Sequence, residues 1–182
     1  MVMGNIVLTG FMGTGKTAVG KELARLLDIP LIDIDTEIEK SEEMTINDIF
    51  REYGESGFRE IETVMIKKVV QRGRRVISTG GGAVLKDENM EVLRENGVII
   101  CLVASPETIL RRVGTGSERP LLQGGDPLIK IERLLHSRKP YYDKADIIVD
   151  TENRTPLQIA EDITERIRNR QHRKKAYEKN QG

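Results

Sequence analysis

The chain has 182 residues, 38% of them hydrophobic and 32% charged, and its formal net charge is zero. This length and apolar content predict one globular domain with its own core. The absence of any apolar run of about 18 residues excludes a membrane-spanning helix. The chain enters an apolar run almost at once and has a single cysteine, Cys101, inside another. We therefore expect a cytoplasmic protein in which Cys101 is a core residue.

Short apolar runs alternate with amphipathic segments along the chain. The predicted strands are Ile6–Thr9, Leu31–Ile34, Arg75–Ser78, Val98–Val103 and Ile147–Val149. The predicted helices are Lys16–Leu27, Ile46–Tyr53, Ser56–Arg72, Asp87–Glu95, Ser105–Val113, Pro127–Lys139 and Pro156–Arg170. This alternation is typical of a three-layer α/β fold, a parallel sheet with helices on both faces. Ligands of such sheets bind beyond the carboxyl ends of the strands.

The first predicted strand leads into residues 10–17, GFMGTGKT, which fit the phosphate-binding pattern G-x-x-x-x-G-K-[ST]. Its glycines let the backbone N–H groups wrap around an anion at the start of the next helix. In this pattern Lys16 reaches the β- and γ-phosphates, and the Thr17 hydroxyl binds Mg²⁺. The chain is thus predicted to bind a nucleotide. The expected contacts are Gly13, Thr14, Gly15, Lys16, Thr17 and Ala18.

Two acidic residues, Asp33 and Asp35, follow the second predicted strand. Residues two apart in an extended segment point to the same side. The pair is therefore predicted to face one crevice, with one carboxylate toward Mg²⁺ and the other toward a second substrate. The alternative is an ordinary strand end whose acids cap the next helix. The spacing alone does not decide between the two.

Three consecutive glycines, residues 80–82, follow the third predicted strand. They permit a close approach of backbone N–H groups to a ligand. They also suit a tight turn before the helix at Asp87. The sequence leaves both interpretations open, although three glycines are more than a turn requires.

An irregular region at about residues 113–126 has glycines toward both ends and is predicted to be a lid. It carries Arg119. A positioned arginine stabilises the negative charge of a transferring phosphoryl group, and the alternative is a solvated loop residue.

Basic residues are concentrated at the carboxyl end of the chain. From Arg166 onward there are seven lysines and arginines against one glutamate. Only Tyr177 is aromatic there, so a nucleic-acid partner has little support. We expect a single domain over residues 1–170, followed by a frayed basic tail over residues 171–182.

Taken in order, these blocks resemble the shikimate kinase family from about Asn5 to Pro156. The resemblance is carried by the glycine-rich loop with Gly20, Asp33-x-Asp35, Phe58-Arg59 with Glu62, Gly80–Gly82, Arg119–Leu122, Arg138-x-Pro140-x-Tyr142, and Asp150-Thr151 with Pro156. It implies a P-loop kinase fold with strand order 2-3-1-4-5 and a helical substrate-binding region inserted at about residues 35–62. It also implies transfer of the γ-phosphoryl of ATP to the 3-hydroxyl of shikimate with Mg²⁺, by a monomer without nucleic-acid or membrane partners.

The resemblance further implies roles for single residues. Asp35, Lys16 and Arg119 would be catalytic, and Thr17 and Asp33 would hold the metal. Shikimate would be bound by Asp35, Phe58, Arg59, Gly80, Gly81, Gly82 and Arg138, with the two arginines on its carboxylate. Arg112, Arg154 and Pro156 would flank adenine. Phe50 and Phe58 are expected to form an apolar wall against the ring of shikimate or, alternatively, to pack in the core.

Two other functions remain open. A gluconate kinase or nucleoside-monophosphate kinase shares the loop and the lid, but it would not need the acceptor set of Asp35, Arg59, residues 80–82 and Arg138. A non-catalytic nucleotide-binding module would be marked by the loss of Asp35, Arg59 or Arg119, and all three are present.

Overall fold

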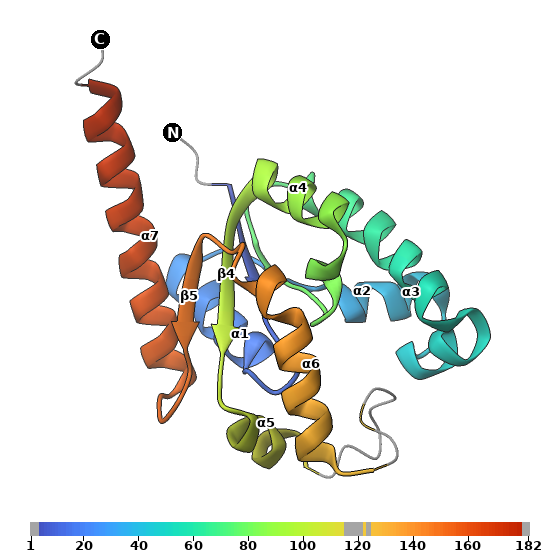
Figure 1. The fold of residues 1–182 in the computed structure, drawn as a ribbon. Helices are drawn as coiled ribbons and strands as arrows, with labels where there is room; N and C mark the ends of the chain where they lie inside the picture. Colours follow the sequence, from blue (N-terminus) through green and yellow to red (C-terminus); the bar gives the residue numbers. More distant parts are fainter. Residues whose placement is uncertain (1–3, 115–121, 123–124, 180–182) are drawn as a thin grey trace.

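The computed structural model describes residues 4–114, 122 and 125–179 (Figure 1). At its centre is a five-stranded sheet with the order β2-β3-β1-β4-β5, in which every pair is parallel. This confirms the predicted fold class and strand order. The strands are β1 (Asn5–Thr9), β2 (Leu31–Asp33), β3 (Val76–Ser78), β4 (Gly97–Val103) and β5 (Ile147–Asp150).

Helices cover both faces of this sheet and divide the core in two. One face packs against α1 (Lys16–Leu27) and α7 (Pro156–Lys179). The core on the opposite face contains residues from α2 (Ile34–Glu42), α3 (Ile46–Val70), the 3-10 turn η1 (Ala83–Leu85), α4 (Asp87–Asn96), α5 (Pro106–Val113) and α6 (Pro127–Tyr142). Side chains alternate along β1, with Ile6 and Leu8 in the first core and Val7 in the second. The strands are apolar on both sides because both faces are buried.

The register of the strands brings three chain segments to one edge of the sheet. Leu8 lies opposite Ser78, and Ser78 lies opposite Asp33. The loop after β1, the glycines after β3 and the acids after β2 therefore emerge side by side, although they are far apart in sequence. This edge is where ligands of parallel sheets bind.

Helix α2 is not among the helices predicted from the apolar pattern, although the family resemblance implies a helical region over about residues 35–62. The strand β2 ends at Asp33, and the helix begins at Ile34. The expectation that Asp33 and Asp35 share an extended segment is therefore wrong. Among the residues of α2 only Ile34 and Ile38 are buried, so its apolar stripe is too short to give a clear helical pattern.

Other boundaries differ from the prediction for identifiable reasons. The two helices expected between Ile46 and Arg72 form α3, which is interrupted at Gly54 by a left-handed φ of 67°. Helix α6 continues through Pro140 to Tyr142, because a proline in the last turn removes one hydrogen bond without ending the helix. Helix α7 continues past Arg170 to Lys179, and up to His172, where the description of its side chains ends, Ile167 is the last buried residue. In Figure 1 its carboxyl-terminal part projects beyond the rest of the domain.

The remaining general expectations concern Cys101 and the membrane. Cys101 lies on β4 and is fully buried. Burial raises the pKa of its thiol to about 12, so it is an uncharged core residue, as predicted. Within the described ranges, no helix is both long enough and apolar enough to cross a membrane.

Candidate active site

The loop between β1 and α1 has the backbone that its glycines predict. Gly10, Gly13 and Gly15 have φ angles of 133°, 76° and 95°, a range that residues other than glycine rarely adopt. Gly15 is the N-cap of α1, so the loop ends at the positive end of a helix dipole. The Lys16 ammonium donates to the carbonyls of Gly10 and Phe11, both at 2.9 Å. The loop is thus a cradle of N–H groups with a cation above it, suited to phosphates.

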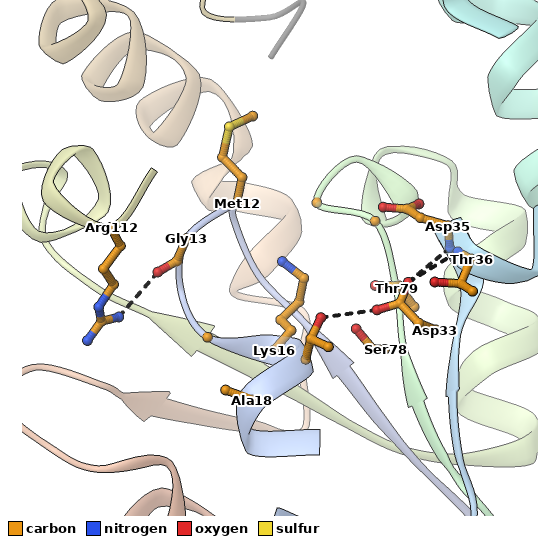
Figure 2. A pocket seen from close by; sticks show the side chains of 14 residues that line it. Met12, Gly13, Lys16, Ala18, Asp33, Asp35, Thr36, Ser78, Thr79 and Arg112 are labelled. Carbon is orange, nitrogen blue, oxygen red and sulfur yellow. Dashed lines mark hydrogen bonds between the residues drawn. The ribbon is translucent and has the colours of Figure 1, made fainter. Parts of the chain in front are cut away.

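A cavity of about 530 Å³ opens over this loop (Figure 2). Its lining residues are Met12, Gly13, Gly15, Lys16, Thr17, Ala18, Asp33, Asp35, Thr36, Ser78, Thr79, Gly80, Gly81 and Arg112. Most of the predicted nucleotide contacts lie here, with the buried Thr14 behind them: its hydroxyl donates to the Phe11 carbonyl at 2.7 Å. Met12, Thr36, Ser78 and Thr79 were not predicted. Met12 lies within the glycine-rich loop, while no short motif marks Thr36, Ser78 and Thr79, because the neighbouring ends of β2 and β3 bring them to this edge.

Asp33 caps the next helix, as one of the two interpretations expects, and its position beside Thr17 also fits the other, although a contact with Mg²⁺ stays a prediction. One carboxylate oxygen accepts from the backbone N–H groups of Asp35 and Thr36, at 3.2 and 3.5 Å, and so caps α2. The other accepts from the Thr17 hydroxyl at 3.1 Å. Figure 2 shows this bond joining α1 to the end of β2. A hydroxyl and a carboxylate side by side at a phosphate cradle fit Mg²⁺, which takes few protein ligands and completes its shell with water and phosphate oxygens.

Asp35 is a half-buried residue in the first turn of α2. It lines the nucleotide cavity, and it also lines a second, smaller cavity next to it. The second cavity is lined by Met12, Asp35, Ile46, Phe50, Phe58, Arg59, Gly80, Gly81, Gly82 and Arg138. Asp35 therefore faces the shared crevice, as predicted, although it reaches it from a helix. We call the smaller cavity the acceptor cavity.

A buried ion pair forms one wall of the acceptor cavity. The Arg59 guanidinium donates to Glu62 at 2.7 Å and to Glu55 at 3.1 Å. The Glu62 side chain is fully buried. Burial raises the pKa of Glu62, and the Coulombic attraction of Arg59 opposes this rise. Both glutamates are on α3, four residues before and three residues after Arg59, so the helix itself fixes the direction of the guanidinium.

Two phenylalanines line the same cavity from α3. Their ring centroids are 4.6 Å apart, and the Arg59 guanidinium lies 5.0 Å from the Phe58 centroid. Phe58 is almost fully buried, and Phe50 packs against the same core. These rings therefore belong to the core and also line the cavity, and their contact with the substrate ring stays a prediction.

The glycine segment, residues 80–82, is needed for space and not for unusual backbone angles. None of the three has a left-handed φ. A Cβ on Gly80 would lie 2.7 Å from a Glu62 oxygen, and a Cβ on Gly82 would lie 2.3 Å from an Arg59 nitrogen. Only glycine lets the segment pass this close to the charged side chains.

Arg138 lies on α6, across the cavity from α3. Its side chain is buried, with the guanidinium 5.5 Å from the centroid of Phe11. It lies 3.5 Å from the Gly81 carbonyl, which also accepts a hydrogen bond of 2.7 Å from the Tyr142 hydroxyl. The structure therefore brings Asp35, Arg59, the glycine segment and Arg138 together around one cavity.

The residues expected near adenine are less closely grouped. Arg112 lines the nucleotide cavity and donates to the Gly13 carbonyl at 3.3 Å and to Thr151 at 3.0 Å. Arg154 pairs with Asp162 at 3.0 Å and, like Pro156, is not among the lining residues of either cavity. Their adenine contacts stay predictions. Arg119 and most of the predicted lid lie outside the described residues.

Comparison with known proteins supports this arrangement. The profile of the shikimate kinase family matches residues 12–168. Shikimate kinases of Thermodesulfovibrio yellowstonii and Caldicellulosiruptor bescii are each 52% identical over 161 residues, which is 88% of this chain and 93% and 94% of theirs. The solved shikimate kinase of Acinetobacter baumannii in complex with shikimate is 38% identical and superposes with a TM-score of 0.89, covering 92% of this chain and 94% of that one. The chain therefore belongs to the shikimate kinase family.

Proposed function

We propose that this protein transfers the γ-phosphoryl group of ATP to the 3-hydroxyl of shikimate. The observation that carries the proposal is the position of Asp35, Gly80 and Gly81, which line both the nucleotide cavity and the acceptor cavity. A hydroxyl bound beside Asp35 faces the phosphate cradle directly. Because phosphoryl transfer depends chiefly on positioning and charge stabilisation, this adjacency is its main requirement.

On the nucleotide side, the loop N–H groups and Lys16 bind the phosphates and neutralise their charge. Lys16 reaches them by exchanging its carbonyl contacts at Gly10 and Phe11 for phosphate oxygens. Thr17 and Asp33 are the residues that would hold Mg²⁺, which neutralises phosphate charge when bound. Arg119 is proposed to add a further positive charge at the transferring group.

On the acceptor side, the chemistry of the cavity suits a small cyclic carboxylate with hydroxyls. Arg59 on α3 and Arg138 on α6 both line the cavity, and planar guanidinium groups bind carboxylates in two-pronged fashion. Phe50 and Phe58 provide an apolar surface for the ring. Asp35 is placed to accept a hydrogen bond from the attacking hydroxyl and to orient it. We assign Asp35 this orienting role, with proton acceptance as a secondary one, because a loose transition state needs little help from a base.

ADP release from MgATP tests the proposal, with shikimate, gluconate and AMP offered to separate samples of the purified protein. Turnover is expected with shikimate only. Asp35→Asn keeps the size of the side chain and removes its charge, and it is expected to lower kcat about 100-fold or more. Asp28→Asn, at the far end of α1, is the matched control and should leave kcat unchanged.

The other outcomes separate the rival functions. Turnover with gluconate or AMP would keep the P-loop assignment and overturn the acceptor. Binding of ADP without turnover on any acceptor would favour a non-catalytic nucleotide-binding module. A monomeric state and a cytoplasmic location stay predictions.

A further inference from the structure

The glycine segment touches the acceptor-binding side chains on one side and α6 on the other. On the first side, a methyl group added to Gly80 would collide with Glu62 and lie tightly against Asp35, and one added to Gly82 would collide with Arg59. The position of this segment therefore fixes the space available to these charged groups. Whatever holds its backbone in place also holds the shape of the acceptor cavity.

On the second side, the Gly81 carbonyl is held by two residues one turn apart on α6. The Tyr142 hydroxyl donates to it at 2.7 Å, which is a short, well-formed bond. Arg138 reaches the same oxygen only at 3.5 Å, the outer limit of a hydrogen bond. Tyr142 thus satisfies the carbonyl, and Arg138, which also forms a hydrogen bond with the Tyr142 side chain, is not needed as the donor to that carbonyl.

Tyr142 is well suited to be a permanent donor. Its side chain is 5% exposed. Burial raises the pKa of its hydroxyl to about 12, so the group keeps its proton at every pH at which a kinase is assayed. Because the ring packs in the same core as Phe11 and Phe58, the hydroxyl has a fixed direction.

We propose that Tyr142 is a positioning residue for the acceptor, acting through Gly81 and Arg138. Its hydroxyl fixes the Gly81 peptide and prevents that carbonyl from drawing Arg138 away from the substrate carboxylate. This inference rests on the proposed function, since it concerns how the same cavity binds shikimate. Without the hydroxyl, Arg138 is the remaining α6 donor to this half-buried glycine's carbonyl in the described part of the chain, and the guanidinium is expected to turn toward it.

The test is steady-state kinetics of Tyr142→Phe, which removes one oxygen and keeps the ring. The KM for shikimate is expected to rise about tenfold, the effect of one buried hydrogen bond, while the KM for MgATP changes less than about twofold. Tyr141→Phe is the matched control. Tyr141 is its half-buried neighbour on α6, and in the described part of the chain no hydrogen bond joins its hydroxyl to the glycine segment.

Two further variants distinguish positioning from a merely structural role. The Tyr142→Phe effect should largely disappear in an Arg138→Lys background, because lysine cannot offer the two-pronged contact that Tyr142 protects. Replacement of Tyr142 by para-aminophenylalanine keeps an N–H donor at this position and should restore the KM for shikimate to within about twofold of the wild type.

Several results would overturn the inference. An unchanged KM for shikimate, equal rises in both KM values, or additive effects with Arg138→Lys would each contradict it. If Tyr142→Phe is too unstable to assay, the para-amino variant decides alone, and a raised KM for shikimate despite its donor counts against the inference. A wild-type protein that does not turn over shikimate would instead contradict the proposed function.

Discussion

The two halves of the active site are built in different ways. The phosphate cradle comes from one continuous segment, residues 10–17, whose glycine φ angles and helix start are local properties of the chain. The acceptor cavity is assembled from α2, α3, the glycine segment and α6. It also depends on a buried ion pair and on glycines that leave room for it. Phosphate binding is therefore a backbone property, whereas acceptor binding depends on tertiary packing.

This difference predicts that substitutions in the cradle will affect catalysis without affecting folding. Lys16→Met should lower kcat about 1,000-fold, because it removes a positive charge from the transferring phosphoryl group. The free energy of unfolding should change by less than about 1 kcal/mol, since Lys16 is half-buried and its ammonium donates to two backbone carbonyls of a loop whose conformation is set by its glycines. Rapid-quench kinetics and urea unfolding measure the two quantities.

Lys21→Met, at an exposed position on the same helix, is the control and should change neither quantity. A Lys16→Met protein that is destabilised by several kcal/mol would show that the cradle is not the self-contained unit described here.

Substitutions in the acceptor cavity are expected to affect both binding and folding. Arg59→Ala should weaken shikimate binding by about 2–5 kcal/mol and leave ADP binding nearly intact. It should also lower the free energy of unfolding by about 3 kcal/mol, because the buried Glu62 loses its partner. Isothermal titration with each ligand, together with urea unfolding, checks the three values.

Arg51→Ala provides a matched control, since Arg51 is an exposed arginine on the same helix, paired with Asp48. It should alter none of the three values. Equal losses of ADP and shikimate binding in Arg59→Ala would mean that the two halves are not separate sites.

The smallest predicted effect is a pH dependence of the free energy of unfolding, which comes from the acceptor half of the site alone. Glu62 has a raised native pKa, mainly through burial, with Asp35 adding to the rise and Arg59 and Arg138 opposing it. The native state therefore binds this proton more tightly than the unfolded state does. Glu62 thus makes the free energy of unfolding fall as the pH rises from its unfolded pKa of about 4.5 through its native pKa.

Glu62→Gln should remove this decline, whereas Glu60→Gln, at an exposed position on α3, should keep it. Urea unfolding of the three proteins across this pH range measures the slopes. If Glu62→Gln leaves the slope of unfolding free energy against pH unchanged, the pH dependence must come from another group.

The same contrast explains which features could be predicted from the sequence. The sheet order could be predicted from the family resemblance. The glycine-rich loop and the Arg59–Glu62 pair involve residues that lie close together along the chain. Helix α2 was missed because two buried isoleucines are too few to give a helical period. Asp33 could not be assigned one role, because it caps α2 with one oxygen and meets Thr17 with the other.

The glycine segment and Tyr142 show what sequence patterns leave out. The glycines suggested contact with a ligand, but their requirement for space arises from Glu62 and Arg59, which lie on another element. The Tyr142 hydroxyl meets a carbonyl 61 residues earlier in the chain, and no local pattern marks such a contact. Features that depend on tertiary packing become visible only when the elements are placed in space.

The most direct test of this account is a crystal structure of the protein with MgADP and shikimate. We predict the shikimate carboxylate between Arg59 and Arg138, one ring hydroxyl on Asp35 facing the phosphate cradle, and Mg²⁺ beside Thr17 and Asp33. Shikimate bound elsewhere, or bound with its carboxylate away from both arginines, would contradict the division of the site into a backbone-built nucleotide half and a packing-built acceptor half.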